Sequence, residues 1–111
     1  MDAWELTDVE ATRAERGRLY HEFLTVPDLS AGLYVLEAGA TDPQSPHGED
    51  ELYYVIEGRG RIQVGDDDRA VESGSLVFVA ATVPHRFHDI TERLVLLVAF
   101  GPAEGSRATI G

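Results

Sequence analysis

Short apolar runs broken by turn residues dominate the chain from residue 19 onward. The first run alternates between apolar and polar residues and stops at Pro27. The runs number roughly eight to ten at even spacing, and the clearest cover residues 19–24, 32–37, 52–56, 61–64, 70–71, 76–79, 85–88 and 94–100. No convincing helical pattern lies between them, so the sequence predicts an all-β barrel or sandwich.

Residues 1–18 have no consistent apolar face. Trp4, Leu6 and Val9 do not fall on one side of a helix, and Gly17 would stop any helix there. We therefore expect an irregular N-terminal arm. The chain has 111 residues without a linker or an internal repeat, so one domain is expected over its whole length.

The runs 52–56 and 94–100 are apolar on both faces. A strand of a small barrel buries only one face, so the second face needs a cover, which either another sheet of the chain or another subunit can provide. We expect a homodimer joined through sheet faces or edges.

Composition excludes several functions. The chain carries 20 acidic and 9 basic residues, all of the latter arginine, for a net charge of −11. Such a chain is repelled by nucleic acid and by anionic membranes. It has no cysteine for disulfides, thiolate ligands or nucleophiles, no apolar run near the ~20 residues of a membrane span and no signal-peptide pattern at its start. We expect a cytoplasmic protein.

Histidines and carboxylates are thus the available metal ligands. His47 and Glu51 lie four residues apart, but Pro46 argues against a helix there, and His85 follows Pro84 at the start of another strand. Two imidazoles and a carboxylate that point into a barrel would make a metal site with open positions. Spacing alone does not decide this, because histidine and glutamate near turns are usually surface groups.

Two segments resemble the motifs of the cupin superfamily. The segment GATDPQSPHGEDELYYVIEG (39–58) resembles the first motif, G-x5-H-x-H-x3,4-E-x6-G, and GSLVFVAATVPHRFHD (74–89) resembles the second, G-x5-P-x-G-x2-H-x3-N. The resemblance covers residues 39–89 and extends loosely over most of the chain. It implies a double-stranded β-helix, or jelly-roll barrel. In the second motif, Ala80, Thr82 and Asp89 replace Pro, Gly and Asn, which concerns turn geometry rather than ligands.

The resemblance implies one divalent metal ion (Zn, Fe, Mn or Ni) held by His47, Glu51 and His85. Ser45 stands where the family has its first histidine. The neighbouring Gln44 is a candidate fourth ligand, because glutamine serves this role in cupin-fold phosphomannose isomerases. Strict alternation would point Gln44 away from Ser45, although the flanking prolines disturb alternation. A metal-free cupin therefore remains an alternative.

The surroundings of this site favour a cation and a small polar metabolite. Segment 42–51 holds four acidic residues and no base, a local −4 that favours a divalent cation over a phosphate. Alternation places Tyr53, Val55 and Phe87 inside the barrel, where Tyr53 is a candidate to hydrogen-bond a substrate. Glu49 is the other candidate for a catalytic role. Arg86 and His88 should face outward, and His21 receives no role.

Three functions follow from this interpretation. The first is a metal-dependent enzyme, of the dioxygenase, isomerase or lyase type, acting on a small polar metabolite. The second is a non-catalytic ligand-binding protein, and the third is a metal-free structural dimer. The glycines at 58 and 60 do not form a nucleotide loop, because no helix follows them, and we interpret residues 58–61 as a β-turn.

Overall fold

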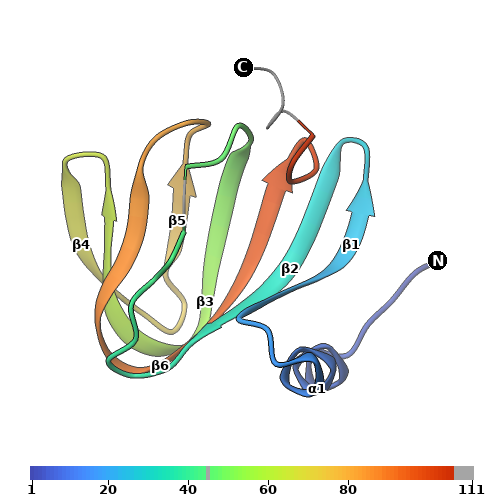
Figure 1. Ribbon diagram of the computed structural model, residues 1–111, viewed down its shortest axis with the longest axis horizontal. Helices are drawn as coiled ribbons and strands as arrows, with labels where there is room; N and C mark the ends of the chain where they lie inside the picture. The colour runs from blue at the N-terminus through green and yellow to red at the C-terminus, as the bar shows by residue number, and fades with distance from the viewer. Residues whose placement is uncertain (45, 107–111) are drawn as a thin grey trace.

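A single antiparallel sheet, bent on itself, forms most of the molecule (Figure 1). The computed structural model describes residues 1–44 and 46–106. Its elements are α1 (Leu6–Arg16), β1 (Tyr20–Val26), β2 (Leu29–Leu36), β3 (Asp50–Val64), β4 (Asp67–Glu72), β5 (Leu76–Val79) and β6 (His85–Gly101). The strand order is β1-β2-β6-β3-β4, and β5 pairs with β3. The all-β prediction is therefore correct.

The long strands β3 and β6 build both halves of the sheet. They pair along their whole length, and β3 pairs on its other edge first with β5 and then with β4. The predicted runs 52–56 and 61–64 are thus one strand rather than two. The β-turn predicted at 58–61 is wrong: Gly58, at φ 101°, lets the strand bulge where any Cβ would lie 2.1 Å from the carbonyl oxygen of Arg93.

The prediction of an irregular N-terminal arm is wrong for residues 6–16, which form α1. Tertiary contacts stabilise this helix rather than an amphipathic pattern, because Val9 is its only buried side chain among the described residues. Glu10 on α1 accepts hydrogen bonds from Arg13 (2.8 Å) and from Arg93 on β6 (2.7 Å). The helix ends at Gly17, whose left-handed φ of 63° caps it.

The sheet carries two apolar clusters, one on each face. The cluster inside the barrel includes Tyr53, Val55 and Phe87, as alternation predicts. The second lies under α1, where Val9 packs with Leu33, Val35 and Val95. Helix α1 therefore provides part of the cover that the doubly apolar run 94–100 requires.

The cover stops short of the outer face of β3 and β5. Cross-strand pairing places Leu52 opposite Phe78 and Tyr54 opposite Leu76. All four side chains are exposed, Phe78 by 61% and Leu76 by 64%. We refer to these four residues as the outer apolar patch. Within residues 1–44 and 46–106, no helix is both long and apolar enough to cross a membrane.

Candidate metal centre

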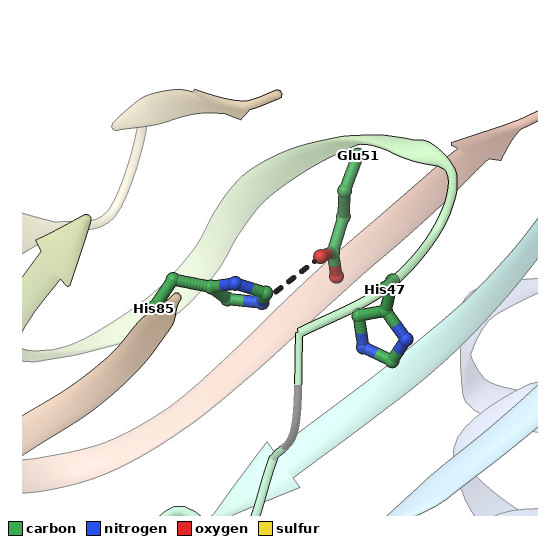
Figure 2. A group of neighbouring side chains, drawn as sticks. All are labelled: His47, Glu51 and His85. Atoms are coloured by element: carbon green, nitrogen blue, oxygen red, sulfur yellow. Dashed lines mark ion pairs between the residues drawn. The ribbon is translucent and has the colours of Figure 1, made fainter. Parts of the chain in front are cut away.

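Three of the residues predicted to bind metal converge at one end of the barrel interior. Glu51 lies at the start of β3, His85 is the first residue of β6, and His47 belongs to the loop before β3. One ligand atom from each lies within 4.8 Å of the others, a spacing close to that of ligands around a single ion. Figure 2 shows the imidazole of His85 and the carboxylate of Glu51 directed toward each other, with the imidazole of His47 beside the carboxylate.

Glu51 and His85 are buried without hydrogen-bond partners for the atoms that face each other. Their side chains are each 1% exposed, and Nε2 of His85 lies 3.1 Å from Oε1 of Glu51. Nε2 and both Glu51 oxygens nevertheless have no hydrogen-bond partner among the described residues. Buried polar atoms without partners are costly, and a divalent ion would satisfy all three. The donor set therefore fits a metal.

The tautomer of His85 leaves the correct nitrogen available. Nδ1 lies 3.0 Å from the carbonyl oxygen of Val83, to which it can only donate, so Nε2 keeps the lone pair that a metal needs. Burial by itself would lower the pKa of His85. The adjacent Glu51 carboxylate and the Val83 carbonyl outweigh burial and raise that pKa above its ordinary value. Without a metal, the pair therefore favours a proton on Nε2.

His47 is held by its backbone and by two side chains. The N–H of Thr82 donates to the His47 carbonyl (2.6 Å), which fixes the loop against the turn before β6. The imidazole packs edge-on to Phe100, with ring centroids 5.0 Å apart, and Nδ1 lies 3.8 Å from Oε2 of Glu104. Ser45, the departure from the motif that prompted the metal-free alternative, lies outside the described residues.

With this geometry established, similarity to known proteins assigns the family. Residues 32–100 match the cupin domain family. The chain belongs to the cupin family. An uncharacterized protein of Streptomyces coelicolor is 47% identical to this cupin over 104 residues, which are 94% of this chain and 99% of that protein.

Solved structures agree with the fold. The protein TT1209 from Thermus thermophilus superposes with a TM-score of 0.74 at 24% identity, over 92% of this cupin and 98% of that chain. KdgF from a Halomonas species gives a TM-score of 0.70 at 18% identity, over 78% of this cupin and 79% of that chain. At these identities the likeness concerns the fold, and it confirms the all-β jelly-roll predicted from the motifs.

Gln44, the candidate fourth ligand of this cupin, lies beside the site in a hydrogen-bonded chain. Its Nε2 donates to Oδ2 of Asp42 (2.8 Å), and its Oε1 accepts from the Tyr53 hydroxyl (2.8 Å). Burial, followed by the charge of Glu51, raises the pKa of Tyr53, so its hydroxyl stays protonated and serves as a donor. The amide oxygen of Gln44 has two lone pairs, and the bond from Tyr53 uses only one of them. The second could still bind a metal, so the role of Gln44 as a fourth ligand stays a prediction.

The local charge of −4 is not concentrated on the site. Asp42 is buried and accepts hydrogen bonds from the Tyr34 hydroxyl (2.5 Å) and the Phe87 N–H (2.9 Å). Asp50 is exposed and accepts from the N–H of Ala81 (2.9 Å). These two carboxylates join loops to strands. Of the four acidic residues, only Glu51 belongs to the group that could hold a metal.

A cavity of about 100 Å³ adjoins two of the three ligand candidates, His47 and Glu51. Its walls are Tyr20, Tyr34, Gln44, His47, Glu51, Val98, Phe100 and Glu104. The sequence interpretation missed Tyr20 and Glu104 as wall residues of this cupin. Neither belongs to a motif: Tyr20 sits on the first strand, and Glu104 reaches the site from the segment after β6.

The other predicted residues lie where alternation places them. Phe87 packs edge-on against Tyr53 inside the barrel, with centroids 4.9 Å apart, and Arg86 is exposed. His88 lies on the outside with Nε2 2.6 Å from Oδ2 of Asp68. Glu49, the other catalytic candidate, is buried and accepts from the Gly105 N–H (3.0 Å), outside the three-residue metal group.

Proposed function

We propose that this cupin binds one divalent metal ion through His47, Glu51 and His85 and acts as an enzyme on a small polar metabolite. The observation that carries the proposal is the trio of buried atoms without hydrogen-bond partners, Nε2 of His85 and both oxygens of Glu51, beside a cavity. A protein core rarely leaves such atoms unsatisfied unless they have a ligand.

When bound, the ion supplies Lewis acidity or an oxygen-activating centre, depending on its identity. The residues of the cavity wall would orient the bound metabolite and shield it from solvent. Two histidines and one carboxylate leave open positions on the cavity side, and Phe100 and Val98 make part of the wall apolar. The Tyr53 hydroxyl donates its hydrogen bond to the Gln44 amide oxygen. Tyr53 therefore orients Gln44, which lines the cavity, and does not itself contact the ligand.

Metal analysis of protein purified without an affinity tag tests this proposal. We expect close to one equivalent of a divalent metal per chain, or uptake to that level on reconstitution. Less than roughly a tenth of an equivalent after reconstitution would falsify the metal site and favour the metal-free structural cupin. A metabolite that raises the unfolding temperature of the loaded protein without product formation would favour the non-catalytic ligand-binding function.

The homodimer stays a prediction, and the outer apolar patch is the surface that it would use. A two-fold interface presents the same patch from both copies, so a second chain is a chemically matched partner for Leu52, Tyr54, Leu76 and Phe78. We expect a dimer in light scattering at micromolar concentration. Phe78→Arg should yield monomers, whereas Arg86→Ala, a change at an exposed position on β6, should leave the dimer intact.

A further inference from the structure

The cavity beside the metal site has two acidic side chains in a wall that is otherwise largely apolar. Glu51 and Glu104 both line it, and among the described wall residues only His47 can carry a positive charge. Oε2 of Glu104 lies 3.8 Å from Nδ1 of His47, so this carboxylate stands directly beside the proposed metal ligands. A divalent ion would balance the charges of the two wall carboxylates, so the described wall residues would offer no net positive charge to an anionic ligand.

The second observation is a buried hydroxyl without a partner. The Tyr20 hydroxyl oxygen is shielded from solvent and makes no hydrogen bond among the described residues. Its ring lies against Gly32, where any Cβ would come within 2.3 Å of it, and packs edge-on to Phe100 and Tyr34. The packing thus leaves the hydroxyl of a residue that lines the cavity without a partner, at a cost to stability, since a phenylalanine would fit without that cost.

We infer that the cavity of this cupin selects a small ligand that bears a hydroxyl or ammonium donor and no negative charge, with Tyr20 and Glu104 as its specificity-determining residues. The inference rests on the proposed function. A carboxylate accepts hydrogen bonds from such donors, and the Tyr20 hydroxyl can both donate and accept. The volume of about 100 Å³ corresponds to about three water molecules, which suits a two-carbon group.

Three probes of one skeleton test the charge preference: ethane-1,2-diol, ethanolamine and glycolate. Their binding is measured by saturation-transfer NMR at pH 8 on both the zinc-loaded and the metal-free protein. We expect the diol and ethanolamine to bind the metal-free protein at least about tenfold more tightly than glycolate does, because a carboxylate repels an anion in a shielded site. Equal or tighter binding of glycolate to the metal-free protein overturns the inference, as does no binding of any probe up to about 0.1 M.

Two variants assign the selectivity to residues. Glu104→Gln should strengthen glycolate binding about tenfold and weaken ethanolamine binding, with the diol within about twofold. Glu22→Gln is the matched control, because it removes a nearby charge that does not line the cavity, and it should leave the ratios unchanged. An unchanged glycolate-to-diol ratio in Glu104→Gln overturns the role of Glu104.

Tyr20→Phe separates recognition from structure. It should weaken diol binding about fivefold without lowering the unfolding temperature of the ligand-free protein, because the hydroxyl has no partner to lose. A lower unfolding temperature with unchanged diol binding would make the hydroxyl structural and overturn its assignment. Metal content is measured separately. A protein that binds no metal but still discriminates by charge would contradict the proposed function and support this selectivity.

Discussion

Two histidines on β6, three residues apart, each face a carboxylate. The two pairs differ in burial and in hydrogen bonding. His85 and Glu51 are buried, 3.1 Å apart, and lack hydrogen-bond partners for their facing atoms. His88 and Asp68 lie at the surface, 2.6 Å apart, and Arg61 also donates to Asp68 (2.9 Å). The facing atoms of the first pair would gain a partner from a bound ion, whereas Asp68 and His88 already have hydrogen-bond partners and lie in contact with solvent.

The comparison shows that a histidine beside a carboxylate does not by itself indicate a metal site. Although desolvation opposes it, hydrogen bonds from Arg61 and His88 lower the pKa of Asp68, as in an ordinary surface ion pair. At Glu51 none of the arginines in the described part of the chain takes that place, and the third member of the group is His47. What distinguishes the pairs is which face of β6 each histidine occupies.

The largest expected effect separates the two histidines directly. His85→Ala should weaken zinc binding by about a hundredfold or more, because it removes Nε2, one of the three proposed metal ligands. His88→Ala, on the same strand, should leave zinc binding within about twofold of the wild type. Titration against a chromophoric chelator measures both, with circular dichroism to confirm folding. Intact uptake by His85→Ala would show that the ligand assignment is wrong.

A smaller effect concerns pH. A proton on Nε2 of His85 competes with the ion, so zinc affinity should fall by about tenfold per pH unit below the pKa of His85. Because Glu51 and Val83 raise that pKa, the fall should begin above pH 6.5. Affinity that stays constant between pH 6 and pH 8 would contradict the competition.

The same raised pKa has the opposite consequence for the metal-free protein. A group with a higher pKa in the folded state stabilises that state when protonated. The contribution of His85 should be fully present below the unfolded pKa of about 6.5 and lost as pH rises through the folded value. Urea unfolding of wild type against His85→Gln, in the presence of a chelator, measures it, and equal pH dependence of the two would argue against this contribution.

The smallest expected effect compares two positions near these pairs, one in the turn before β6 and one within β6. Thr82 before His85 and Asp89 after His88 both have left-handed backbones, with φ of 69° and 47°. Thr82→Gly should stabilise the protein by about 0.5–1 kcal/mol, because a β-branched residue is strained there. Asp89→Gly should gain less, since aspartate tolerates this conformation. Thermal unfolding measures both, and a gain at Asp89 equal to that at Thr82 would contradict the reasoning.

These two positions also show that the motifs contain information about backbone conformation. The family pattern has Gly and Asn at the positions of Thr82 and Asp89, and both residue types suit a left-handed backbone. The sequence interpretation assigned these departures to turn geometry, which holds for Thr82 in the turn before β6, whereas Asp89 has its left-handed backbone inside β6. Alternation likewise placed Tyr53, Val55 and Phe87 inside the barrel, because side chains of a strand point to opposite faces in turn.

The sequence by itself determined the all-β class, the cupin family and the three residues that could hold a metal, because motif spacing and alternation are properties of neighbouring residues. Only the tertiary structure decided that residues 6–16 form a helix, since the Glu10–Arg93 contact joins residues 83 positions apart. It also decided that Asp42 and Asp50 serve loops rather than the site, and it brought Tyr20 and Glu104 to the cavity. Those contacts arise where distant strands and loops meet, and no local pattern encodes them.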